Sequence, residues 1–151
     1  MNDISTLNTE ERLQTIKQRI NTACQQAGRS KSSVTLIGAS KRKTSTLIQA
    51  FAQHGLNDVG ENYLQEAIDK RKDLRSIPLN WHFIGQIQSN KTKTIAENFS
   101  WVHGIDRFKI AQRIAKQNPT PSTPINLLVQ LNPDSEDSKG GVPLDLSLIH
   151  I

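Results

Sequence analysis

A lysine stands directly after a short apolar run, at a position where its amine could act as a nucleophile. Residues 33–40 (SVTLIGAS) are rich in apolar and β-branched side chains, which predicts a buried strand, and Lys41 follows the last of them. An amine at the end of a buried strand loses solvation, which favours the neutral form that condenses with an aldehyde to a Schiff base. Lys43 would lie on the same side if the extended geometry continued, and its charge would add to this effect. Lys41 is therefore a candidate nucleophile, and an ordinary surface lysine is the alternative.

Polar side chains also close the other strand-like runs. These runs cover residues 57–60, 81–85, 101–103 and 125–132, and the polar residues at their ends are Glu61, Asn62, Gln86, Gln88, Asn90, His103, Asp106, Gln130 and Asn132. In parallel α/β sheets the carboxyl ends of the strands face a common crevice, and ligands bind there. We therefore expect one polar pocket that these strand ends share with Lys41. The alternative is that polar residues merely mark the ends of strands.

The sequence contains no recognised motif for a nucleotide phosphate or a zinc ion. The phosphate-binding motifs GxxxxGK[ST] and GxGxxG are missing, and no Cys/His cluster has the spacing of a zinc site. His82 and His103 lie within strand-like runs, where a hydrogen-bonded structural histidine is commoner than a metal ligand. The single cysteine, Cys24, falls on the apolar side of a predicted helix, so we expect a buried thiol.

Helical and strand patterns alternate along the chain, which predicts a parallel α/β fold. Helices are expected around residues 13–27 and over residues 45–54, 62–74, 90–99 and 106–117, and three prolines predict a loop over residues 118–124. Residues 125–132 (INLLVQLN) form the strongest strand pattern, of the kind that belongs to parallel strands buried on both faces. Five such strands could form an open doubly wound sheet or the first part of a (β/α)8 barrel, which needs about 250 residues in full.

Composition and charge narrow the possible partners. The chain of 151 residues has a net charge of +5, but its basic residues are scattered, and the densest group (Lys41, Arg42, Lys43) has no interleaved aromatics. We therefore expect no nucleic-acid partner, and a small molecule that bears a phosphate would profit from the same field. No apolar run is long enough to span a membrane, the N-terminus lacks a signal-peptide pattern, and one cysteine cannot form an internal disulfide. Together these features predict a cytoplasmic protein with no membrane partner.

Several longer stretches carry a resemblance to a known family. They are TLIGASKRK at 35–43, VGENYLQEAIDK at 59–70, WHFIGQIQSNK at 81–91, HGIDR at 103–107 and LLVQLNPDSEDSKGG at 127–141. In this order the chain resembles the pyridoxal phosphate homeostasis protein family, and the combination of GENY-x-QE with WHFIG-x-xQ-x-NK is highly specific. The resemblance implies pyridoxal 5'-phosphate as the cofactor and a barrel of the alanine racemase N-terminal type, with about five of its eight strands present.

The resemblance also implies the residues that contact the cofactor. Lys41 matches the lysine that forms the Schiff base, Asn62 matches an asparagine near the cofactor, and His82, Gln88, Asn90 and Lys91 match the third-strand signature at the same mouth. Lys139 and Gly141 match the loop after the fifth strand in position only. Thr44 stands where the family usually has proline, and threonine can cap the following helix equally well.

By the same resemblance, the protein carries or regulates pyridoxal phosphate without catalytic turnover, acts as a monomer and has cofactor-dependent enzymes as its clients. The alternative is a cofactor-dependent amino-acid racemase. A racemase needs a second acid or base on the opposite face of the cofactor, and the only tyrosine, Tyr63, directly follows Asn62. The carrier is the function that we expect.

The end of the sequence predicts an incomplete domain. Residues 1–151 form a single barrel domain, and after Gly141 no stretch resembles the family's remaining strands, which hold the cofactor phosphate. The last ten residues, VPLDLSLIHI, are apolar to the end, whereas natural termini are more often polar. We therefore expect a barrel that is cut at its C-terminus. Whether residues 142–151 belong to the parent sequence stays open at this point.

Overall fold

The computed structural model describes residues 8–134 and 140–143 of the chain. Its strands are β1 (Ile37–Ala39), β2 (Asp58–Glu61), β3 (Asn80–Phe83), β4 (Trp101–Ile105) and β5 (Asn126–Val129). The helices are α1 (Thr9–Gln26), α2 (Ser45–Gln53), α3 (Leu64–Asp73), α4 (Thr92–Asn98) and α5 (Phe108–Lys116), with short 3-10 turns at Lys31–Ser33 and Ser89–Lys91. The predicted alternation of strand and helix is therefore confirmed. Most elements are shorter than their sequence patterns, whereas β4 and α1 are longer.

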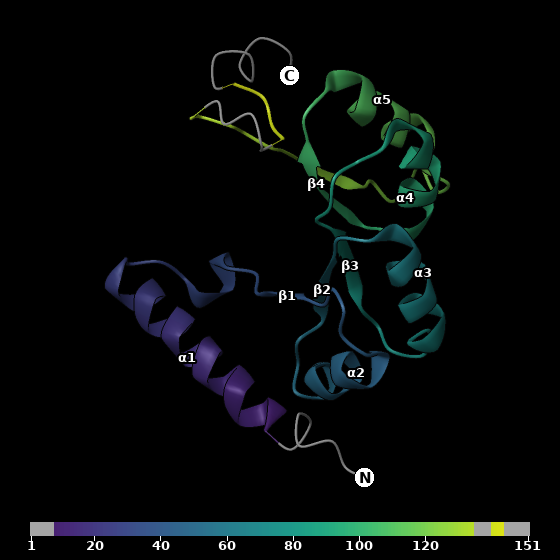
Figure 1. Ribbon diagram of the computed structural model, residues 1–151. Coiled ribbons are helices and arrows are strands. Elements are labelled where there is room, and N and C mark those ends of the chain that lie inside the picture. The colour runs from purple at the N-terminus through teal and green to yellow at the C-terminus, as the bar shows by residue number, and fades with distance from the viewer. Residues whose placement is uncertain (1–7, 135–139, 144–151) are drawn as a thin grey trace.

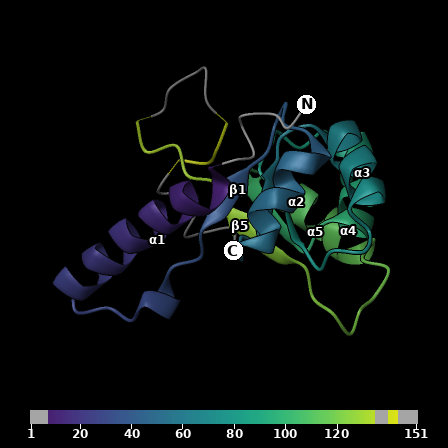
Figure 2. The same ribbon diagram turned by 90° about the horizontal axis from the view of Figure 1, so that it is seen from below.

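All five strands are parallel and pair in the order of the chain, β1-β2-β3-β4-β5. Helices α2 to α5 lie on one face of this sheet, and α1 lies beside β1, where it contacts α2 (Figures 1 and 2). In a doubly wound sheet the strand order reverses at a switch point and helices cover both faces. In a (β/α) barrel the strands pair in chain order and the helices cover one face. The structure therefore supports the partial barrel and not the doubly wound sheet.

Alternation along the strands divides the side chains between the two faces. Val59, Trp81, Phe83 and Val102 point toward the helices and pack with Ile48, Ala67, Ile95, Ile110 and Ile114 in one buried cluster. Gly60, His82 and Trp101 are paired across β2, β3 and β4, and they alternate with the residues of this cluster. They therefore lie on the opposite, concave face of the sheet. This face carries the polar groups.

Local signals set the helix ends. The hydroxyl of Thr44 accepts a hydrogen bond from the backbone N–H of Leu47 at 3.3 Å, so threonine caps α2 as expected. Gly28 and Gly55 have positive φ angles of 63° and 82° directly after α1 and α2, a conformation that glycine adopts without steric cost. Cys24 is buried, as expected.

One prediction about the strands is wrong. The run at residues 125–132 was expected to be buried on both faces, but Leu128, Val129 and Leu131 are 39%, 37% and 43% exposed. The reason is position: within the described residues β5 pairs only with β4, so it is an edge strand.

Candidate functional site

Lys41 lies in a tight turn directly after β1. The N–H of Lys43 donates to the carbonyl of Ser40 at 2.9 Å, and Arg42 between them has a left-handed backbone with φ 59°. The turn ends the extended geometry at once, so the prediction that Lys43 lies on the same side as Lys41 by strand alternation is wrong. Lys41 itself is exposed and not desolvated as expected, because the strand ends at Ala39 and leaves the lysine beyond its buried part.

The strand registers place Lys41 next to Asn62. Ala39 is paired with Gly60, and the N–H of Ser40 donates to the carbonyl of Gly60 at 2.9 Å. Lys41 and Asn62 each stand two residues beyond this last pair. Both therefore leave the sheet at the same edge, at the carboxyl ends of neighbouring strands.

A polar cleft of about 520 Å³ opens at the ends of β2 and β3. Its lining includes Asn62, Tyr63, Gln86, Gln88 and Lys91 above the apolar side chains of Phe83 and Ile95. Three of the residues matched to the family signature, Asn62, Gln88 and Lys91, thus share one cleft. Their amides and ammonium group can bind an anionic or carbonyl-bearing ligand.

The cleft depends on a close backbone approach at Gly85. A Cβ atom at this position would lie 2.1 Å from the carbonyl oxygen of Asn62, which no side-chain rotation could relieve. The absence of a side chain therefore lets the segment after β3 lie against the segment after β2.

His82 lies within β3 on the concave face and is 2% exposed. Its Nε2 lies 3.0 Å from Oδ1 of Asp58, its Nδ1 lies 3.1 Å from Nε2 of His103, and its ring stacks on Trp101 at a centroid distance of 5.6 Å. A carboxylate only accepts, so Nε2 of His82 donates to Asp58, and in a neutral ring Nδ1 accepts from His103. This geometry confirms the hydrogen-bonded structural interpretation of both histidines.

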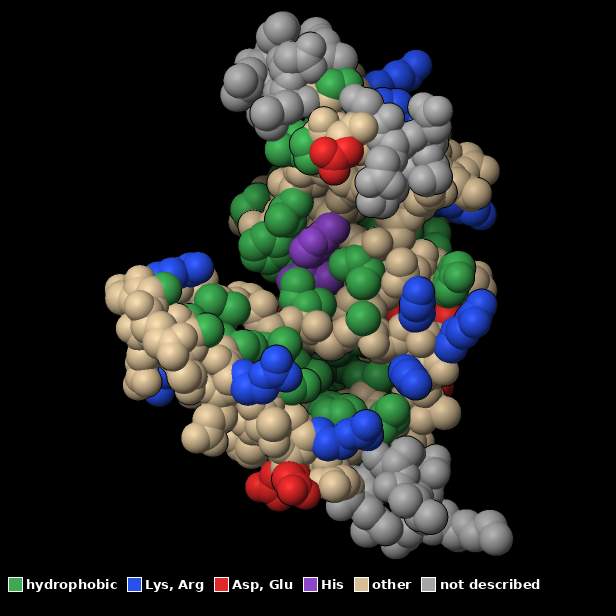
Figure 3. Space-filling view, turned by 60° about the vertical axis from the view of Figure 1, so that its left-hand side comes forward, with side chains coloured by type: hydrophobic (Ala, Val, Ile, Leu, Met, Phe, Trp, Pro, Cys, Tyr) green, Lys and Arg blue, Asp and Glu red, His purple; other side chains and the backbone are tan. Residues whose placement is uncertain are grey.

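The surroundings of His103 disfavour its charged form. Burial lowers the pKa of His103 below its ordinary value, and the neighbouring His82 lowers this pKa further. In Figure 3, histidine side chains lie among hydrophobic ones on the side of the sheet that helices α2 to α5 leave open. The concave face thus disfavours a positive charge on His103.

The expectation of one pocket shared by all five strand ends is wrong. Only the ends of β2 and β3 line the polar cleft. The side chain of Gln130 instead donates to the carbonyl of Gly140 at 2.6 Å, and Asn90 is exposed in the turn before α4. Gly141 has φ 126° and lies against the backbone of residues 130–132, while Lys139 and residues 144–151 lie outside the described residues.

A buried ion-pair network beneath the Lys41 turn was not expected from the sequence. Glu61 was expected to face the pocket, but it is fully buried on the helix side of the sheet, where Lys70 of α3 donates to its Oε1. Lys70 also donates to Oε1 of Glu66 at 2.6 Å, and this hydrogen bond lowers the pKa of Glu66 more than partial burial raises it. The i,i+4 spacing of Glu66 and Lys70 predicts a pair on one helix face, but only the packing of α3 on β2 reveals its burial.

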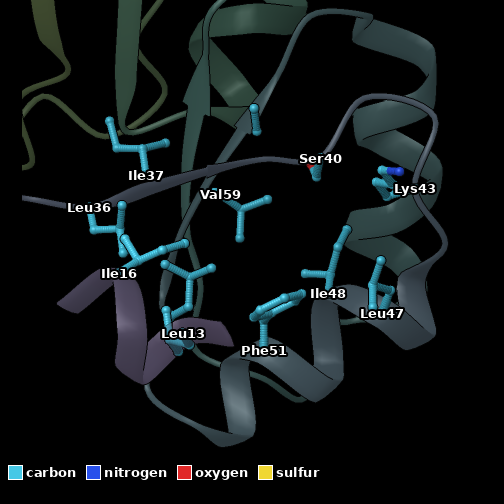
Figure 4. A pocket seen from close by; sticks show the side chains of 13 residues that line it. Leu13, Ile16, Leu36, Ile37, Ser40, Lys43, Leu47, Ile48, Phe51 and Val59 are labelled. Carbon is cyan, nitrogen blue, oxygen red and sulfur yellow. The ribbon is translucent and has the colours of Figure 1, made fainter. Parts of the chain in front are cut away.

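A second hollow is apolar and lies apart from the polar cleft. It has a volume of about 250 Å³ between α1, β1 and α2, and its lining includes Leu13, Ile16, Phe51 and Val59, with Ser40 and Lys43 at one end (Figure 4). Within the part of the chain that the structure describes, no three His, Cys, Asp or Glu side chains gather as a metal site would require. Over the same residues, none of the helices combines the length and the apolar character needed to cross a membrane.

Comparisons with known proteins agree with the motifs. No family model matches the chain. The pyridoxal phosphate homeostasis protein of Pseudomonas aeruginosa is 49% identical over 137 residues, which are 90% of this chain and 60% of that protein. The structure of PipY from Synechococcus elongatus with pyridoxal phosphate bound has a TM-score of 0.70 and 29% identity, and the match covers 85% of this chain and 60% of PipY.

A more distant likeness concerns the fold alone. Alanine racemase from Corynebacterium glutamicum matches 88% of this chain and 37% of its own, with a TM-score of 0.52 and 17% identity. This likeness, with that to PipY, confirms a partial barrel of the alanine racemase N-terminal type. The chain spans about 60% of the length of the curated relative above. With its five matching stretches and its parallel barrel wall, the chain is similar to pyridoxal phosphate homeostasis proteins over about nine tenths of its own length.

Proposed function

We propose that this chain binds pyridoxal 5'-phosphate through a Schiff base on Lys41 and takes part in carrying or regulating this cofactor. The observation that carries the proposal is the place of Lys41: its amine is exposed at the carboxyl edge of the sheet, two residues beyond the register pair that also leads to Asn62. No ion pair or hydrogen bond to the ammonium group is found within the described part of the chain. The relatives named for pyridoxal phosphate homeostasis and the cofactor-bound PipY support the choice of ligand.

The residues present fit this cofactor. Bound pyridoxal phosphate supplies an aldehyde that condenses with a lysine amine with loss of water. The amides of Asn62 and Gln88 can bond its polar ring substituents, and the Lys91 ammonium favours an anion at the cleft that all three line. Asn90 is exposed between the cleft residues Gln88 and Lys91, and His82 is buried on the concave face with both ring nitrogens hydrogen-bonded, so the resemblance alone supports a cofactor contact for these two residues. The contacts of these five residues with the cofactor are part of the proposal.

The test is an absorbance titration of the purified chain with pyridoxal phosphate. We expect a Schiff-base band near the visible edge that Lys41→Ala removes and the control Lys43→Ala retains. Reduction with borohydride and peptide mapping should then place the label on Lys41. A label found chiefly on Lys43 or Lys91 would refute the assignment.

The proposal includes a carrier role without turnover, in the cytoplasm, as a monomer and with cofactor-dependent enzymes as partners. The relatives' name supports the carrier role, and Tyr63 supports no racemase, because it stands beside Asn62 in the same cleft and not across from it. We expect no conversion of L-alanine to D-alanine above a blank with free cofactor. Turnover that Lys41→Ala abolishes would favour a racemase instead.

A further inference from the structure

Both neighbours of Lys41 in the chain are held by one set of side chains. On one side, the carbonyl of Ser40 accepts a hydrogen bond from the Lys70 ammonium at 2.7 Å, and its hydroxyl donates to Glu61 Oε1 at 2.6 Å. On the other side, the N–H of Arg42 donates to Glu66 Oε1 at 2.6 Å. Lys41 thus sits between two fixed points, while its own side chain is left exposed.

Lys70 ties the two fixed points together. Its ammonium group donates to three oxygens at once, those of Ser40, Glu61 and Glu66, and so uses all three of its donors. The side chain of Lys70 is 7% exposed and that of Glu61 is fully buried. Salt and water screen the attraction between buried charges less than that between exposed charges. The Lys70–Glu61 pair therefore constrains the positions of its partners more than a surface ion pair would.

The backbone of the turn needs such support. Arg42 has a left-handed conformation with φ 59°, which is unfavourable for a residue with a side chain unless neighbouring groups stabilise it. The bond from its N–H to Glu66 does this directly. The turn-closing bond from Lys43 N–H ends on the Ser40 carbonyl, the same oxygen that Lys70 holds.

We propose that Glu66 and Lys70, with Glu61 beneath them, are positioning residues for Lys41: they fix the turn that presents its amine to the cofactor. This inference rests on the proposed role of Lys41. The alternative is that the network only fastens α3 to the sheet. In that case its loss would lower stability and leave the cofactor affinity of the folded protein unchanged.

The first experiment compares three variants of α3 in the chain as it exists. Glu66→Ala removes the acceptor of the Arg42 N–H, Glu66→Gln keeps an oxygen there, and Asp69→Ala is the control, because Asp69 pairs only with the exposed Lys72 and Gln65. We expect Glu66→Ala to weaken cofactor binding, measured by the Schiff-base band, by about tenfold, the effect of losing one charge-assisted hydrogen bond. Glu66→Gln should regain most of this affinity, and Asp69→Ala should match the wild type.

Lys70 is tested together with its buried partner. Lys70→Met alone would leave Glu61 buried and unpaired, so the double variant Lys70→Met/Glu61→Gln is used, in which neither position is charged. We expect this variant to fold and to bind the cofactor as weakly as Glu66→Ala does.

A second measurement needs no cofactor. Trypsin cleaves after Lys41, Arg42 and Lys43, so its rate there reports how firmly the turn is held, and cleavage after Arg113 in α5 reports general unfolding. We expect the ratio of the two rates to rise about tenfold in Glu66→Ala and to stay unchanged in Asp69→Ala.

The outcomes separate the two proposals. If the wild-type chain forms no Schiff-base band on Lys41, the proposed function fails, and with it the positioning of an amine for the cofactor, even if cleavage shows that the network holds the turn. If the band forms but Glu66→Ala binds as tightly as Asp69→Ala, the proposed function stands and the positioning role is overturned. The positioning role is supported if Glu66→Ala lowers the cofactor affinity and raises the cleavage ratio, and if Glu66→Gln reverses both changes.

Discussion

At the scale of single residues, Gly85 decides how the two segments of the cleft meet. A Cβ at this position would overlap the carbonyl oxygen of Asn62, a backbone atom that cannot rotate away. We expect Gly85→Ala to lower the free energy of unfolding by about 2 kcal/mol or more and to weaken any ligand binding in the cleft. Urea denaturation measures the first effect.

The control for this substitution is Gly140→Ala. A Cβ at Gly140 would make only an ordinary contact of 3.8 Å with Gln130 Nε2. The free energy of unfolding should then change by less than about 0.5 kcal/mol. Equal effects of the two substitutions would contradict the role given to Gly85.

His103 makes stability depend on pH. Its folded-state pKa lies below the ordinary value of 6.5, because burial and His82 disfavour the imidazolium, so the unfolded chain takes up the proton first as the pH falls. The stabilisation is therefore complete above pH 6.5 and is lost as the pH falls through the lowered pKa. We expect the chain to unfold in less urea at about pH 5.5 than at about pH 7.5, and His103→Gln to reduce this difference.

His82 contacts His103, Asp58 contacts His82, and both stay in place in this variant. An unchanged pH dependence in His103→Gln would contradict the role given to His103. Glu66 has a lowered pKa as well, but its contribution is lost only below its ordinary value of 4.5, so it does not affect this window.

At the scale of elements, β5 is the least protected part of the sheet. It pairs with β4 alone among the described strands, and its Leu128 and Val129 are 39% and 37% exposed. An apolar edge strand is a template for pairing between molecules. We expect Leu128→Lys to reduce self-association at high concentration, measured by light scattering, with little loss of thermal stability.

The control for the edge is Phe108→Lys. Phe108 is 65% exposed but stands at the start of α5, away from a sheet edge. If this substitution reduces self-association as much as Leu128→Lys, general surface hydrophobicity and not the edge would be the cause.

At the scale of the whole molecule, the chain spans about 60% of a curated relative. Among the strands that the structure describes, β1 and β5 each have one unpaired edge, and the apolar hollow lies beside β1. We expect a version extended by the remaining strands of a family barrel to unfold at a higher temperature and to bind pyridoxal phosphate more tightly, because those strands would cover these surfaces. Equal unfolding temperature and affinity in the two versions would show that the open sheet is sufficient by itself.

The sequence by itself determined the order of the elements, the capping of α2 by Thr44, the buried Cys24 and the similarity to pyridoxal phosphate homeostasis proteins. Each of these follows from a short segment of sequence. Apolar periodicity and capping residues predict the elements, and runs such as GENY and WHFIG carry the resemblance. It also predicted that Lys41 and Asn62 lie at strand ends, because both directly follow apolar runs.

Only the tertiary structure decided which of the polar residues meet. Glu61 and Asn62 are adjacent in the sequence, yet Glu61 is buried against Lys70 while Asn62 lines the cleft, because side chains alternate between the faces of a strand. The exposure of Lys41 depends on the left-handed turn at Arg42, and that of β5 on which strand lies beside it. Some of these contacts join residues far apart in the sequence, such as Arg42 and Glu66, which are 24 positions apart, and a local pattern carries no information about such pairs.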